Sequence, residues 1–236
     1  MQRVLPSAAI SYTPIPRQNR VTPFGEIIAT PARGTLMGNR GSLHDSQGTI
    51  RRAYAGKRWI ICLLEFKNRQ RMIMTPGQYT ELFFLDEATA LAAGHRPCAE
   101  CQRERFTHFR ALWAAANPQL AHKATPTAGT VDAVLHAERL STVQRPLLSL
   151  RETAQLPNGT FVAPVGEETA YLVLQSRLLR WSPFVYQKVS AAFVGTFVDT
   201  EVRLLTPPSL VRTLAEGFVA GLHASEESSA AIKMCH

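Results

Sequence analysis

Residues 81–101 read ELFFLDEATALAAGHRPCAEC, and this stretch carries the clearest local signals in the 236-residue chain. The apolar residues 79–85 predict a strand, and Asp86 follows directly as a good N-cap for an alanine-rich helix. Gly94 ends that helix at the C′ position. A second helix is expected to begin near Cys98, so the stretch predicts a strand, a helix and a cysteine pair at the start of another helix.

Short strands are predicted on both sides of this stretch. Upstream, the β-branched and aromatic residues 59–66 predict a strand, with Lys67-Asn68 as the turn to a hairpin partner at 69–74. Downstream, residues 131–140 read as a strand or a short helix, and Thr206 with two prolines starts a helix. Further strands are predicted at 160–165, 170–179, 193–199 and 201–205. The fold class is therefore α+β, with a small antiparallel sheet, helices and a metal site in the N-terminal half and a strand-rich C-terminal half.

Four segments are predicted along the chain. The proline-rich residues 1–24 form an extended arm, residues 25–117 a basic domain, residues 131–223 a neutral strand-rich α+β domain, and residues 224–236 a mobile polar tail. The small and polar residues between the two domains mark the boundary.

The positive charge is confined to the first half of the chain. The formal net charge is +8; residues 1–110 hold 16 basic and 8 acidic side chains, and the rest holds 10 of each. Arginine accounts for 21 of the 26 cations, and its planar guanidinium favours phosphate ligands. We therefore expect a nucleic acid or another phosphate-bearing partner for the first half.

No run is long and apolar enough to span a membrane, since the most apolar stretch, residues 59–66, has only the length of a strand. Prolines interrupt the N-terminal residues that would form the apolar region of a secretory leader. Four cysteines in a chain of this length do not make a disulfide framework. A cytoplasmic protein that is not integral to a membrane is expected.

Cys98 and Cys101 form a CxxC pair at a turn that enters a helix. Both sulfurs can point at one ion there, and a helix N-terminus favours the thiolate form that binds metal. CxxC pairs also serve thiol redox chemistry, but such pairs follow a strand within a βαβ unit, whereas a helix precedes this one. Metal binding is the favoured interpretation.

The same residues, 81–101, resemble the second half of the zinc-binding domain of Ada-type DNA-repair proteins. In that family a strand with paired aromatics, an alanine-rich helix, Gly-x-Arg-Pro and CxxC follow one another in this order. The resemblance implies that Cys98 and Cys101 are two of four ligands to Zn²⁺, in a domain that contacts DNA and serves DNA repair. The family carries a second pair, spaced CxxxC, about thirty residues upstream, whereas this chain has Cys62 alone in that region.

Structural zinc takes four ligands, so two more are needed. Cys62 lies nearest to the place of the family's first ligand, although a mid-strand cysteine can equally be a buried apolar residue. His44, in a glycine-flanked polar loop beside Asp45, completes the favoured set. His95 could close an HxxCxxC chelate, but packing is the favoured role there. His108 and His136 are weaker candidates.

The sequence thus predicts a zinc protein that binds nucleic acid, DNA in preference to RNA, through an arginine-rich surface. The phosphate contacts predicted from it are Arg40, Arg69, Arg71, Arg96, Arg103 and Arg105. One alternative is a metal-dependent hydrolase or nuclease that uses His44 and Asp45 as catalytic residues near the metal. A second alternative is a domain in which zinc is purely structural.

Overall fold

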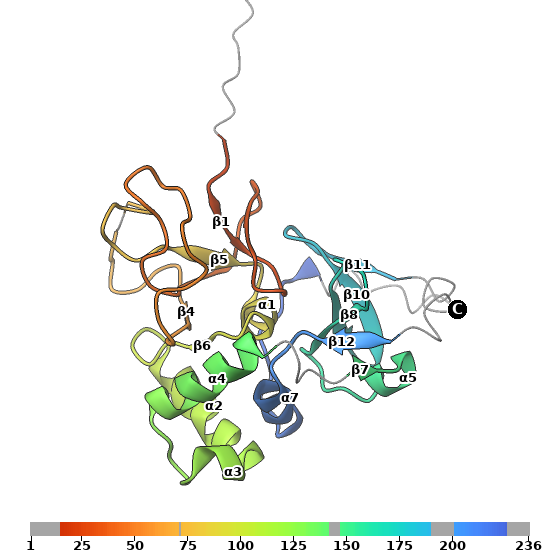
Figure 1. The fold of residues 1–236 in the computed structure, drawn as a ribbon. Coiled ribbons are helices and arrows are strands. Elements are labelled where there is room, and N and C mark those ends of the chain that lie inside the picture. Colours follow the sequence, from red (N-terminus) through yellow and green to blue (C-terminus); the bar gives the residue numbers. More distant parts are fainter. Residues whose placement is uncertain (1–14, 71, 142–146, 190–200, 226–236) are drawn as a thin grey trace, which may run out of the picture.

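The computed structural model describes residues 15–70, 72–141, 147–189 and 201–225. Within these ranges the chain forms six helices and two six-stranded sheets (Figure 1). The predicted α+β class is confirmed, and the sheet of the N-terminal half is larger than predicted.

The first sheet is built from strands β1 to β6 in the order β2-β1-β5-β3-β4-β6. Two of its pairings are parallel, β1 with β5 and β4 with β6, so the sheet is mixed, whereas the sequence predicted an antiparallel one. Its strands are β1 (Gln18–Val21), β2 (Ile27–Ala29), β3 (Leu36–Asn39), β4 (Ile60–Cys62), β5 (Leu82–Phe84) and β6 (Arg96–Pro97).

The second sheet has the order β11-β10-β9-β8-β12-β7, and all of its pairings are antiparallel. The Gln175-Ser176 turn, with both residues at positive φ, joins β9 to β10 in a hairpin. The strands are β7 (Leu147–Leu148), β8 (Phe161–Pro164), β9 (Tyr171–Leu174), β10 (Arg177–Trp181), β11 (Tyr186–Lys188) and β12 (Val202–Leu204).

The helices follow their sequence signals closely. Asp86 caps α1 (Glu87–Ala92) by accepting a hydrogen bond from the Thr89 backbone N–H, and Gly94 follows at φ +80°. The other helices are α2 (Arg103–Ala116), α3 (Pro118–Ala121), α4 (Ala128–Leu140), α5 (Leu150–Thr153) and α7 (Pro208–Ala215).

The structure corrects two sequence predictions and decides between the strand and the helix predicted as alternatives for residues 131–140. The strand predicted over 59–66 is confined to β4, and none of the described residues of 69–74 forms the predicted hairpin partner, since β3 and β6 pair with β4. Residues 131–140 belong to helix α4. Helix α2 begins at Arg103, because a turn comes between Cys98 and the helix. The predicted strand at 193–199 lies outside the described residues.

One hydrophobic core contains side chains of both sheets. Phe84 of β5, Phe109 and Trp113 of α2, Phe161 of β8 and Leu214 of α7 all belong to it. Helix α1 lies between the two sheets (Figure 1), and every residue of this helix is buried. The small alanine side chains of α1 let both sheets approach it closely.

Candidate metal centre

Cys62, Cys98 and Cys101 come together in the first sheet, with their three sulfurs within 4.8 Å of one another. Cys62 ends β4, and Cys98 directly follows β6, the parallel neighbour of β4. Cys98 and Cys101 are thus brought to Cys62 across one strand pairing. The group can hold a metal ion, and its three thiols form no disulfide.

Backbone hydrogen bonds fix the cysteine turn against β4. The N–H of Cys98 donates to the carbonyl of Ile61 at 2.9 Å, and the Gln102 side-chain amide donates to the same carbonyl at 2.9 Å. The Glu100 N–H donates to the Cys98 sulfur at 3.4 Å. The positions of the sulfurs therefore follow from the register of the sheet.

The three thiols perturb one another's ionisation. A hydrogen bond from the Cys62 thiol is the main reason that the pKa of Cys98 falls to about 5. The same hydrogen bond and burial raise the pKa of Cys62 well above its usual range, and burial with the charge on Cys98 raises the pKa of Cys101. Without a metal, one thiolate and two thiols are expected near neutral pH, so an ion that takes three thiolates displaces two protons.

The sulfur positions fit a tetrahedral zinc ion. Zn–S bonds of about 2.3 Å place neighbouring sulfurs about 3.8 Å apart, and the three sulfurs, all within 4.8 Å of one another, are near enough to share one ion. Among the described residues, no histidine nitrogen or carboxylate oxygen belongs to the group. A CxxxC pair that included Cys62 would need a cysteine at position 58 or 66, and Arg58 and Phe66 stand there.

The cysteine group lies in the wall of a cleft of about 1080 Å³. Leu63, Leu64 and Ile73 also line the cleft and are partly exposed. The contacts that hold this part of the chain include a hydrogen bond from Arg17 to the Ile73 carbonyl, a hydrogen bond from the Met74 N–H to the buried Glu81 carboxylate at 2.7 Å, and the pairing of Arg69 with Glu100 at 2.6 Å. Further lining comes from Met37, Asn39, Gly41, Arg58, Ile60, Phe66, Gln70, Tyr79, Phe83, Arg96, Ala99, Ala128, Gly129 and Asp132.

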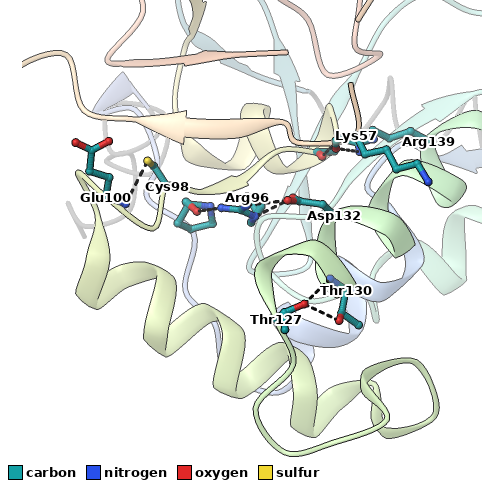
Figure 2. A network of polar contacts seen from close by, with 10 residues as sticks. Lys57, Arg96, Cys98, Glu100, Thr127, Thr130, Asp132 and Arg139 are labelled. Atoms are coloured by element: carbon teal, nitrogen blue, oxygen red, sulfur yellow. Dashed lines mark hydrogen bonds and ion pairs between the residues drawn. The ribbon is translucent and has the colours of Figure 1, made fainter. Parts of the chain in front are cut away.

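A buried ion pair connects the cysteine turn to helix α4. Arg96 donates from Nε and Nη2 to the two carboxylate oxygens of Asp132, both at 2.9 Å, and both side chains are less than 10% exposed. Figure 2 shows Cys98, Arg96 and Asp132 in succession between the turn and α4. Arg139 of the same helix donates to the carbonyls of Gly94 and Lys57, each at 2.8 Å. Helix α4 therefore supports the strand that precedes Cys98.

His44, the predicted fourth ligand, is not among the residues that surround the sulfurs. Its Nδ1 lies 2.6 Å from the Thr80 hydroxyl, and its Nε2 lies 3.2 Å from the Thr75 carbonyl oxygen. Asp45 accepts hydrogen bonds from the backbone N–H groups of Gln47 and Thr49 and so closes its own turn. Neither residue lines the cleft, so the geometry gives no support to a hydrolase that uses them beside the metal.

The other candidate histidines, His95, His108 and His136, also lie outside the group. His95 is fully buried, and its Nε2 accepts a hydrogen bond from Arg40 Nε at 3.2 Å. His136 packs edge-on against Tyr54, and His108 lies on α2 beside Phe218. The packing role favoured for His95 from the sequence matches this position.

The predicted phosphate contacts fall into three groups. Arg40 and Arg96 are buried, at 1% and 2% exposure, and offer no guanidinium to a ligand on the surface. Arg69 pairs with Glu100 and Arg105 with Glu87. Arg103 is exposed, while Arg71 lies outside the described residues. Burial and ion pairing thus remove much of the predicted basic surface.

Sequence reasoning missed the cleft and the role of Asp132. Asp132 belongs to the predicted second domain, yet it is the carboxylate partner of Arg96 in the first. Leu63 and Leu64 gave one signal for the cleft. They continue an apolar run beyond a three-residue strand, and apolar residues in that position either pack in the core or line a cavity. The pairing of Arg96 with Asp132 had no local signal, because the two residues are far apart in sequence.

None of the described helices has the length and apolar character that crossing a bilayer requires.

No protein-family model matches this chain, and no curated protein or solved structure is significantly similar to it. The resemblance of residues 81–101 to the Ada zinc domain stays a prediction, and the function has to be inferred from the geometry of the cysteine group.

Proposed function

We propose that this protein binds one Zn²⁺ through Cys62, Cys98 and Cys101, and that the ion faces the cleft beside them. The observation that carries the proposal is the convergence of three thiols, from two neighbouring strands, within 4.8 Å. Three soft sulfur donors favour zinc over the oxygen-seeking ions Mg²⁺ and Ca²⁺. The bound ion would supply Lewis acidity to a group in the cleft.

The metal content of the purified protein tests this proposal. We expect about one zinc per chain in the parent protein, and a loss of most of it in Cys98→Ser, because one of the three donors is removed. Thr107→Ala, on the exposed face of α2, is the matched control and should keep the metal. Parent protein that stays free of zinc after refolding with excess metal and a reductant would refute the proposal.

A second candidate function is nucleic-acid binding, with DNA favoured over RNA. The observation that favours it is the presence of exposed cations in this half of the chain: Arg58, which lines the cleft, and Lys67 and Arg103, which are close in sequence to residues that line it. The excess of positive charge in residues 1–110 favours the same partner.

Salt-dependent binding to DNA tests this second function. Each lost phosphate contact should lower the slope of log K against log salt by about 0.9 on duplex DNA, or about 0.7 on single strands. We therefore expect shallower slopes for Arg58→Ala and Arg103→Ala in fluorescence anisotropy. Arg177→Ala, an exposed cation of β10, is the control. Equal slopes in all three variants and the parent would remove this function from consideration.

A further inference from the structure

The cysteine group supplies three donors to an ion that takes four. Among the described residues, no further cysteine, histidine or carboxylate lies within 4.8 Å of all three sulfurs. Zinc sites with three protein ligands keep the fourth position for water or for a bound ligand. The cleft beside the sulfurs gives such a ligand a path to the ion.

The cleft has the size and the apolar walls of a small-molecule site. Its volume of about 1080 Å³ lies near the upper end of the range typical for ligand pockets. Its apolar lining includes Met37 of β3, Phe83 of β5, Leu64 and Ile73, and charged side chains such as Arg58 and Arg69 line it as well. Leu64 and Ile73 are 49% and 41% exposed, so a ligand could remove further apolar surface from water.

The chemistry of the site selects the group that would bind the ion. A zinc ion with three thiolates is soft, so a hard oxygen donor such as a phosphate or carboxylate matches it poorly as the fourth ligand. Sulfur is a soft donor that matches such a thiolate-rich ion. A thiol binds as a thiolate after losing its proton to solvent, and the resulting four-sulfur centre, with a net charge of −2, is a common form of zinc site.

We propose that the cleft takes a small-molecule thiol with an apolar body, whose sulfur becomes the fourth ligand of the zinc. This inference rests on the proposed zinc function. In the binding step the Zn–O bond to a water molecule breaks, a Zn–S bond forms, and the thiol proton passes to the solvent. No electrons are transferred. The apolar body of the ligand lies along Leu64 and Ile73, which line the cleft.

Cobalt substitution of the full chain tests the inference, because Co²⁺ takes the place of zinc and its sulfur ligands are visible in absorption spectra. We expect 1-propanethiol and 1-pentanethiol to add sulfur-to-cobalt absorption in a saturable way. Each added methylene should tighten binding about fourfold, so pentanethiol should bind about fifteenfold more tightly than propanethiol. 1-Pentanol should leave the spectrum unchanged.

Two variants locate the ligand. Ile73→Asp places a charge in the cleft wall and should weaken pentanethiol binding about tenfold while leaving the cobalt content unchanged. Val165→Asp changes an equally exposed apolar residue in the turn after β8 and should bind pentanethiol like the parent.

Three results would count against these proposals, and they are distinguishable from one another. A parent spectrum that already shows four sulfur ligands, and that loses one in Cys235→Ser, would overturn the inference, because the chain itself would then fill the fourth position. The inference would also be overturned if the affinity for thiols depended neither on the length of their alkyl chain nor on the Ile73→Asp substitution. Failure to bind cobalt or zinc at all would instead refute the proposed function.

Discussion

Arg96 and Asp132 form the most deeply buried ion pair among the described residues, with two hydrogen bonds of 2.9 Å. Removing one partner of such a pair leaves the other charge buried without a counter-charge. We expect Asp132→Ala to lower the free energy of unfolding by about 3–5 kcal/mol, measured by urea denaturation. Replacing both residues, as Arg96→Met with Asp132→Leu, should restore much of the loss. A single variant as stable as the parent would contradict this assignment.

His95 provides a pH-dependent contribution to stability. Burial, followed by the charges of Arg40 and Arg139, holds the pKa of His95 well below its usual value of 6.5. In the unfolded chain the ring takes up a proton as the pH falls below about 6.5, whereas the folded protein resists it, so stability declines toward acid pH. We expect the free energy of unfolding to fall between about pH 7 and pH 5, and His95→Gln to reduce that slope.

The His95→Gln variant keeps a side-chain oxygen that can accept the hydrogen bond from Arg40 Nε. It therefore separates the effect of titration from the effect of leaving the buried guanidinium without an acceptor. Slopes that are equal in the parent and the variant would mean that His95 does not titrate differently on folding.

At the scale of elements, helix α1 packs between the two sheets and connects them. Its N-cap Asp86 accepts hydrogen bonds from the Thr89 N–H at 2.8 Å, the Tyr186 hydroxyl at 2.7 Å and the His223 N–H at 3.0 Å. A helix of six residues has little stability by itself, so these contacts and the buried alanines hold it in place.

Asp86→Ala should therefore destabilise the protein more than the loss of an ordinary cap. A cap accounts for about 1 kcal/mol, and the buried donors left unpaired add about 1–3 kcal/mol. Urea denaturation measures the change. Asp45→Ala, which removes the acceptor of an exposed turn, serves as the comparison and should cost less. Equal losses in the two variants would show that Asp86 acts only within its own turn.

Element prediction worked where a signal was local. The cap at Asp86 and the glycine at position 94 defined α1, and prolines marked the start of α7. Element prediction failed after Cys62, because the apolar run 59–66 predicted a strand that continues to residue 66, whereas Leu63 and Leu64 line the cleft. Hydrophobicity alone does not distinguish a side chain that packs in a sheet from one that lines a cavity.

The candidate site was predictable in part for the same reason. Cys98 and Cys101 share a turn, so their spacing brought them together on sequence grounds. Cys62 joins them through the parallel pairing of β4 with β6, a contact that depends on the whole sheet. His44 had the right chemistry for a ligand but lies with Thr80 instead, and nothing local indicated this.

At the scale of the whole molecule, the two sheets share one core, with Phe84 and Phe161 in the same cluster. The sequence predicted two domains with a boundary at residues 117–131. Contacts across that boundary include the Arg96–Asp132 pair and the hydrogen bond from Trp181 Nε1 to the Thr89 hydroxyl at 3.1 Å.

These contacts predict that the protein unfolds in one cooperative step. Variants that retain only Trp59, in the first sheet region, or only Trp181, in the second, should show the same urea midpoint by tryptophan fluorescence. A variant with Trp113 and one other tryptophan replaced must first be shown to keep the parent's secondary structure by circular dichroism. Two separate midpoints would instead support independent domains.

The pairing of β4 with β6 also has a consequence for the order of events during synthesis. All three thiols of the cysteine group precede residue 102, so they are synthesised while more than half of the chain is still to be made. Asp132, which neutralises Arg96 beside the cysteine turn, emerges later, and the second sheet later still. The nascent chain thus presents its thiols to metal, or to oxidants, before the helix that supports them exists.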